Sequence, residues 1–129
     1  VIFLLMVFAS TSLMAQENST ETQNINTIVF DKVEHNYGEI EYGGDGNCVF
    51  TFTNTGKEPL VLTSVRASCG CTAPSWPKDP INPGEQGEIK VRYNTTISGN
   101  FNKNITVTCN GNPSSTMLRI KGRVLPKQS

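Results

Sequence analysis

Apolar and polar residues alternate along much of the chain, and this two-residue period limits the fold more than any other feature of the sequence. In segment 47–54, Cys48, Phe50 and Phe52 fall on alternate positions and would share one face of a strand. Further strands are predicted over segments 27–30, 33–37, 60–67, 89–93, 101–109 and 118–124, which turn-forming residues separate. No segment keeps the helical period of about 3.6 residues. The pattern therefore predicts an all-β sandwich in which each strand buries one face.

The apolar faces of these strands define an expected core. Its members are Phe30, Phe50, Phe52, Leu60, Leu62, Ile89, Val91, Tyr93, Ile105, Val107, Leu118 and Ile120. The charged residues between them, such as Lys90 and Arg92, would face solvent.

Segment 68–86 lacks this alternation and is expected to be irregular. Four prolines recur within it at every third position, namely Pro74, Pro77, Pro80 and Pro83. This spacing matches a polyproline II helix, which has three residues per turn. Trp76 lies inside the run, so we expect either a stiff loop whose Trp76 closes one end of the sandwich or a strip that binds a ligand. Pro83 and Gly84 suit the centre of a type II turn, where glycine takes a positive φ.

Residues 1–9 (VIFLLMVFA) form an unbroken apolar run that is shorter than the roughly 20 residues needed to span a bilayer. A buried first strand is one interpretation, but the run is typical of a secretory signal peptide, which would occupy residues 1–15 with cleavage after Ala15. Residues 16–26 are polar and predict a flexible tether. The folded domain would then cover residues 27–126. We expect the mature protein to be periplasmic or secreted and not membrane-spanning.

Composition narrows the functional classes. Eleven Lys and Arg residues balance eleven Asp and Glu residues, whereas nucleic-acid binders usually carry a basic excess. The single histidine, His35, excludes a histidine cluster as a metal site. No motif for a catalytic nucleophile, a phosphate or an organic cofactor is present. The sequence therefore predicts a protein that is not an enzyme and does not bind nucleic acid.

Four segments together resemble the domain-of-unknown-function 1573 family of exported bacterial proteins. In chain order they are 30–38 (FDKVEHNYG), 50–56 (FTFTNTG), 67–72 (ASCGCT) and 83–89 (PGEQGEI). The resemblance covers about residues 28–125 and implies an immunoglobulin-like antiparallel β-sandwich of about seven strands. It implies export and no particular reaction.

The Cys69-Gly70-Cys71 pair is the sharpest chemical feature of the sequence, because Gly70 permits a tight turn that brings the two sulfur atoms together. Three uses remain open. A disulfide suits an exported protein, two thiolates suit Cu(I), and a reactive pair suits thiol–disulfide exchange. Cys48 is a possible third sulfur for a metal.

The remaining cysteines are expected not to pair. In an immunoglobulin-like sandwich, Cys48 and Cys109 would lie on parallel strands of opposite sheets, roughly 20 Å apart along the strand direction. A disulfide needs Cα atoms within about 7 Å. We therefore expect Cys109 to be a buried free thiol, and the Cys69–Cys71 turn to lie at the same end of the sandwich as Cys48.

These observations predict an exported, non-catalytic binding or structural module, whose partner would be a protein or another cell-envelope component. Cys69, Cys71 and Trp76 are its candidate binding residues. The alternative is a thiol-based copper or redox protein that uses Cys69 and Cys71.

Overall fold

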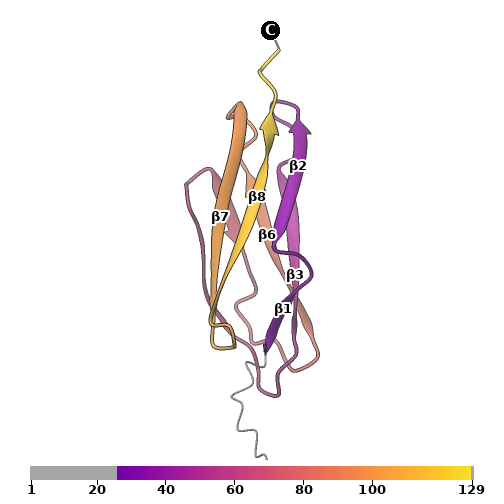
Figure 1. Cartoon of the computed structure of the whole chain (residues 1–129), viewed down its shortest axis with the longest axis vertical. Coiled ribbons are helices and arrows are strands. Elements are labelled where there is room, and N and C mark those ends of the chain that lie inside the picture. Colours follow the sequence, from indigo (N-terminus) through magenta and orange to yellow (C-terminus); the bar gives the residue numbers. More distant parts are fainter. Residues whose placement is uncertain (1–25, 129) are drawn as a thin grey trace, which may run out of the picture.

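The computed structural model describes residues 26–128, which fold into strands and turns without a helix (Figure 1). The strands are β1 (Ile28–Phe30), β2 (Glu34–Ile40), β3 (Asn47–Asn54), β4 (Leu62–Ala67), β5 (Thr72–Ser75), β6 (Gln86–Tyr93), β7 (Gly99–Cys109) and β8 (Ser115–Val124). The predicted all-β sandwich is confirmed, with eight strands where the sequence indicated about seven.

The strands form two four-stranded sheets, in the orders β1-β3-β6-β5 and β2-β8-β7-β4. Because β1 and β2 follow each other in the chain but lie in different sheets, the first segment of the domain crosses from one sheet to the other. The expectation of purely antiparallel sheets is wrong at one place: β2 pairs with β8 in parallel, and both arrows point the same way in Figure 1. A register shift between Asn36 and Glu39 interrupts this pair, where Gly38 adopts a φ of 66°.

The predicted signal peptide, residues 1–15, and nearly all of the predicted tether lie outside the described residues. Within residues 26–128, no helix has the length and apolar character needed to cross a membrane.

The core lies between the two sheets. Eleven of the twelve expected core residues are buried there, and the twelfth, Phe30, is half-buried and packs against the others. The sequence-based list omitted several further buried side chains, namely Ile28, Ile40, Cys48, Val65, Ile81, Phe101, Cys109 and Val124. Most strands bury one face only, and for this reason the two-residue alternation of apolar and polar residues predicted most of the core.

An aromatic ring covers a glycine in the middle of this core. Phe52 on β3 pairs with Gly87 on β6, and Phe52 is fully buried. A Cβ atom added at Gly87 would overlap the end of the Phe52 ring. Gly87 therefore makes room for a large side chain that fills the space between the sheets.

Segment 68–86 is not irregular throughout, as the sequence suggested. Residues 72–75 form β5, which pairs with β6 so that Pro74 lies opposite Val91. Pro74 is thus part of a sheet ladder, and the four prolines do not form one free polyproline edge. The predicted turn is confirmed, because Gly84 has a φ of 83° and the Glu85 N–H donates to the Asn82 carbonyl at 2.9 Å.

A buried asparagine stabilises the end of the sandwich that lies opposite the Cys69–Cys71 turn. The Asn54 side chain is fully buried, and its Nδ2 donates to the carbonyl oxygens of Glu58 and Ile81, each at 2.8 Å. Its Oδ1 accepts the Gly56 N–H at 2.9 Å. The Asn-Thr-Gly sequence is therefore a structural clamp between the β3–β4 loop and the chain at Ile81.

Candidate functional site

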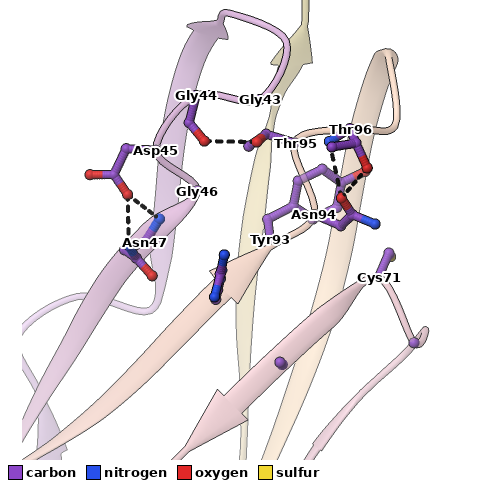
Figure 2. Close-up of a pocket in the computed structure, with 13 residues that line it drawn as sticks. Gly43, Gly44, Asp45, Gly46, Asn47, Cys71, Tyr93, Asn94, Thr95 and Thr96 are labelled. Atoms are coloured by element: carbon purple, nitrogen blue, oxygen red, sulfur yellow. Dashed lines mark hydrogen bonds between the residues drawn. The ribbon is translucent and has the colours of Figure 1, made fainter.

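A cavity of about 520 Å³ lies at one end of the sandwich, where three segments distant in sequence meet. Its lining comes from segment 43–47 between β2 and β3, from Gly70, Cys71 and Ala73 around the cysteine turn, and from segment 92–96 at the end of β6. Figure 2 shows these residues around the space, which we call the loop cavity. Sequence reasoning found Cys71 but missed the other two segments.

Hydrogen bonds to backbone groups hold the two non-cysteine segments together. The Thr95 hydroxyl donates to the Gly44 carbonyl at 2.7 Å (Figure 2). The Gly43 N–H donates to the Thr95 carbonyl at 3.0 Å. The Gly46 carbonyl accepts both the Tyr93 N–H and the Tyr37 hydroxyl at 2.8 Å. The lining is therefore fixed by ordered contacts rather than by loose loops.

Gly46 is required by close packing in this wall. A Cβ atom at this position would overlap the Tyr93 carbonyl oxygen, which is a backbone atom with little freedom to move. The sequence signals for these segments were the Gly-Gly-Asp-Gly run at 43–46 and the Asn-Thr-Thr run at 94–96. Both indicate turns, but neither shows that the two turns meet.

Cys69 and Cys71 lie as a close pair beside this cavity. Their sulfur atoms are in bonding contact, and their Cα atoms are 5.3 Å apart. The Cys71 N–H donates to the Cys69 Sγ at 3.3 Å, and the Thr72 hydroxyl lies 3.9 Å from the Cys69 Sγ and 3.7 Å from the Cys71 Sγ. The Asn94 N–H donates to the Cys71 carbonyl at 2.8 Å, which ties the turn to the end of β6.

The structure does not bring a third sulfur to this pair. Cys48 and Cys109 are buried free thiols, on β3 in one sheet and on β7 in the other. Burial raises the pKa of the Cys48 thiol, which keeps it protonated and disfavours its use as a metal ligand. Residues 26–128 contain no group of three or more His, Cys, Asp or Glu side chains placed to hold a metal ion.

Cys109 belongs to the other end of the molecule. Its sulfur accepts the Gly111 N–H at 3.4 Å and lies 3.5 Å from the Pro113 carbonyl oxygen. By contrast, Asn47, which directly precedes Cys48, lines the loop cavity together with Cys71. The cysteine turn and Cys48 are therefore at the same end, as the sequence predicted.

Trp76 is not part of the loop cavity. It is half-buried, packs against the core, and has the Lys78 ammonium 3.0 Å from its ring centroid. It borders a separate groove of about 370 Å³ near Gly87. The structure thus separates Trp76 from Cys71, so the candidate binding residues do not form one site.

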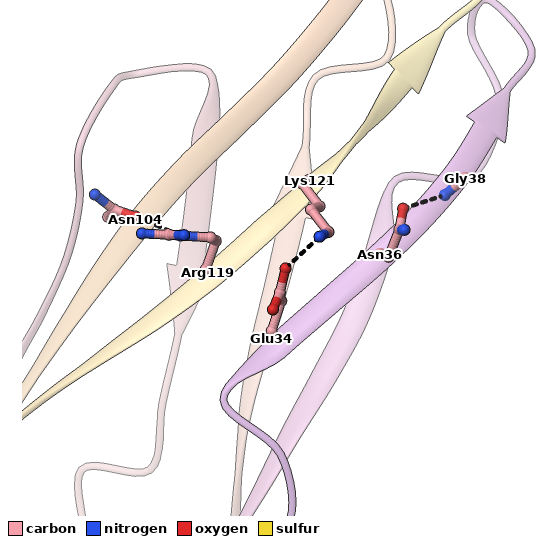
Figure 3. Close-up of polar contacts among 6 residues, drawn as sticks. All are labelled: Glu34, Asn36, Gly38, Asn104, Arg119 and Lys121. Atoms are coloured by element: carbon pink, nitrogen blue, oxygen red, sulfur yellow. Dashed lines mark hydrogen bonds and ion pairs between the residues drawn. The ribbon is translucent and has the colours of Figure 1, made fainter.

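The outer face of the β2-β8-β7 sheet carries paired charges. Lys121 forms an ion pair with Glu34 at 2.7 Å, and this hydrogen bond lowers the pKa of the Glu34 carboxyl (Figure 3). Beside it, the Arg119 Nε donates to the Asn104 Oδ1 at 3.4 Å. Positively charged side chains of β8 on this face thus form ion pairs or hydrogen bonds with side chains of the neighbouring strands.

Two edge strands carry features that oppose pairing with a further strand. On β2, the Gly38 N–H is occupied by the Asn36 Oδ1 at 2.9 Å, next to the register shift (Figure 3). On β5, Pro74 has no N–H to offer. Strand addition along β2 or β5 is therefore disfavoured.

His35 serves a structural role in this arrangement. Its Nδ1 accepts a hydrogen bond from the Lys32 ammonium at 2.8 Å, and its ring packs edge-on against Tyr37 with centroids 4.5 Å apart. Partial burial, and then the Lys32 charge, lower the pKa of His35 below its ordinary value of 6.5. The neutral imidazole is the form that fits this site.

We expect stability to fall as the pH is lowered through about 6.5. In that range the unfolded chain takes up a proton on His35 while the folded chain resists it, so protonation favours unfolding. Urea unfolding midpoints between about pH 7.5 and 5.5 should therefore decrease, and a His35→Gln variant should show a smaller decrease. Equal slopes for both proteins would show that another group is responsible.

Comparison with known proteins places the chain in a family. Residues 28–124 match the family described as "Protein of unknown function (DUF1573)", and the chain belongs to this family. The resemblance found in the sequence is thereby confirmed. No curated protein matches the chain.

Solved structures share the fold at low sequence identity. A protein of unknown function from Porphyromonas gingivalis W83 is 16% identical with a TM-score of 0.68, over 76% of this chain and 46% of that one. The seventh PapD-like domain of human CEP192 is 7% identical with a TM-score of 0.69, over 91% and 98%. The CsuC–CsuE chaperone–tip adhesion subunit pre-assembly complex of Acinetobacter baumannii contains a chain that is 13% identical with a TM-score of 0.54, over 76% and 57%. The chain therefore has an immunoglobulin-like fold, which the PapD-like domain of CEP192 shares, and it spans about half the length of the Porphyromonas protein.

Proposed function

We propose that this protein is an exported, non-catalytic module that binds a polypeptide of the cell envelope at the loop cavity. The observation that carries the proposal is the cavity itself, which three segments build at one end of a rigid sandwich. Loops displayed at the end of such a scaffold are a common place for recognition.

The chemistry of the lining supports a polypeptide as the partner. Arg92 and Asn94 are exposed at its border, and Arg92 has no ion-pair partner among residues 26–128. The glycines at 43, 44 and 46 leave this part of the lining without side chains, while the Gly43 N–H and the Gly44 and Gly46 carbonyl oxygens are used within the wall itself. This mixture suits carboxylate and amide groups, which a polypeptide offers together. The fold likeness to a chain of the chaperone–adhesion subunit complex agrees with a protein-binding role.

Export is supported by the apolar run at residues 1–9 and by the family resemblance. Cleavage after Ala15 would release a chain that begins at Gln16 and carries the domain on a polar segment. N-terminal sequencing of the protein isolated from its own cells, together with cell fractionation, tests this part of the proposal. A cytoplasmic protein that keeps residues 1–15 would contradict it.

Site-specific photocrosslinking in intact cells tests the binding site. A photoreactive phenylalanine derivative in place of Thr96, at the loop cavity, is expected to give a discrete adduct with one envelope protein. The matched control replaces Lys57, which lies at the opposite end beside Gly111, and is expected to give none. A Gly46→Val change, which forces the cavity wall apart, should abolish the Thr96 adduct. Identical adducts from both positions, or adducts from neither, would overturn the proposal.

A further inference from the structure

We propose that Cys69 and Cys71 undergo stoichiometric thiol–disulfide exchange with a dithiol polypeptide, with Cys71 as the sulfur that is attacked and Cys69 as the sulfur that leaves. This inference goes beyond the proposed binding function and does not depend on it. It rests on where the pair lies and on the unequal surroundings of its two sulfur atoms.

The two cysteines differ in their access to the loop cavity. Cys71 lines the loop cavity, whereas Cys69 is not among the residues that border it. Both cysteines are only partly buried, on a turn whose middle residue, Gly70, is exposed and has open space around its Cα. A thiol that enters the cavity therefore meets the Cys71 sulfur.

The two sulfur atoms also differ in their hydrogen-bond donors. The Cys69 Sγ receives the Cys71 backbone N–H at 3.3 Å and lies within reach of the Thr72 hydroxyl at 3.9 Å. Among residues 26–128, the only polar group within hydrogen-bonding distance of the Cys71 Sγ is the Thr72 hydroxyl, at 3.7 Å. Hydrogen bonds to a thiolate lower its pKa, and a thiol of lower pKa leaves faster in exchange. The geometry thus favours departure of Cys69.

Backbone hydrogen bonds hold the segment around the pair independently of the bond between the sulfur atoms. β5 pairs with β6, and the Asn94 N–H donates to the Cys71 carbonyl, so neither contact involves a sulfur atom. A closed loop of about three residues constrains the unfolded chain far less than a long one does. Opening and closing of the pair is therefore compatible with an intact domain.

Exchange with a dithiol partner takes two steps and transfers two electrons to the cysteine pair. A partner thiolate attacks the Cys71 Sγ, a partner–Cys71 disulfide forms, and the Cys69–Cys71 bond breaks with its electrons leaving on the Cys69 thiolate. A second partner thiolate then attacks the partner's own sulfur in this mixed disulfide and releases the Cys71 thiolate. The partner loses two electrons and two protons and gains a disulfide, and the two cysteines end as thiols.

Reduced glutathione is a suitable probe for the first step. The full, oxidised chain is exposed to glutathione, quenched with N-ethylmaleimide, and mapped by fragment-ion mass spectrometry. We expect glutathione on Cys71 and N-ethylmaleimide on Cys69, with about tenfold or greater preference over the reverse arrangement. Glutathione on Cys69, equal labelling, or no mixed disulfide in the folded protein would overturn the proposal.

Two further measurements separate this role from a merely structural bond. The first measurement compares the two thiols one at a time. Cys69 in the Cys71→Ser variant should form its thiolate at lower pH than Cys71 in the Cys69→Ser variant. The Cys69→Ser/Cys71→Ser double variant gives the baseline for Cys48 and Cys109. The Thr72→Val change should slow reduction of the pair by glutathione several-fold, whereas Thr116→Val on β8 should leave that rate unchanged. A reversed order of the two titrations would contradict the assignment of leaving group.

Discussion

The Phe52→Ala variant is expected to lose about 3–5 kcal/mol of unfolding free energy, because a fully buried ring is removed from the centre of the core. Small domains have a total stability of about 5–15 kcal/mol, so this loss would bring the protein close to its unfolding threshold. Urea unfolding followed by circular dichroism measures it. The matched control is Val49→Ala on the same strand, where a partly exposed side chain should change stability by less than about 1 kcal/mol.

The Phe52–Gly87 contact predicts how two changes interact. Gly87→Ala places a methyl group where the Phe52 ring lies, and overpacking of this kind typically costs about 1–3 kcal/mol. In a Phe52→Leu background the end of the ring is absent, so Gly87→Ala should be less costly there. A double-mutant cycle measures this coupling, and strictly additive effects would show that the ring moves aside freely.

The Asn54→Ala variant is expected to lose about 3 kcal/mol, because it leaves the Glu58 and Ile81 carbonyl oxygens and the Gly56 N–H without their partner. Asn54→Asp keeps the acceptor but removes both donors, and it should also destabilise the domain.

Denaturant midpoints for these variants compare directly with that of Asn36→Ala, an exposed asparagine whose Oδ1 accepts a single N–H. The Asn36→Ala change should remain within about 0.5 kcal/mol of the wild type. A similarly small effect at Asn54 would mean that water replaces the side chain at this end of the sandwich.

The fold was predictable from sequence where burial is one-sided, and less so elsewhere. Strands β3 and β6 alternate strictly between buried and exposed positions, which the two-residue period detects. β5 was missed because it has four residues and contains Pro74, which normally argues against a strand. The parallel pairing of β2 with β8 was missed because alternation shows which face is buried and carries no information on which strand lies alongside.

The candidate site was also predictable from the sequence only in part. The Cys69–Cys71 pair could be predicted because the two residues are neighbours in sequence, and a turn at Gly70 is enough to bring them together. The loop cavity could not, because it requires segment 43–47 to meet segment 92–96, and only the assembled sheets decide that contact. Trp76 packs against the core and borders another groove, and its separation from the loop cavity depends on the same assembly.

The parallel β2–β8 pair has a mechanical consequence. The domain begins with the short strand β1, which pairs with β3 in the other sheet and leads directly into β2, and it ends with β8. Figure 1 shows β1 and the C-terminus toward opposite ends of the molecule. Once β1 has detached, tension applied through the two ends would pull β2 and β8 past each other, so their hydrogen bonds would be loaded in shear and would have to break together. Hydrogen bonds arranged this way resist force better than bonds that open one at a time. The β2–β8 pair is therefore the part of the sandwich best placed to resist extension.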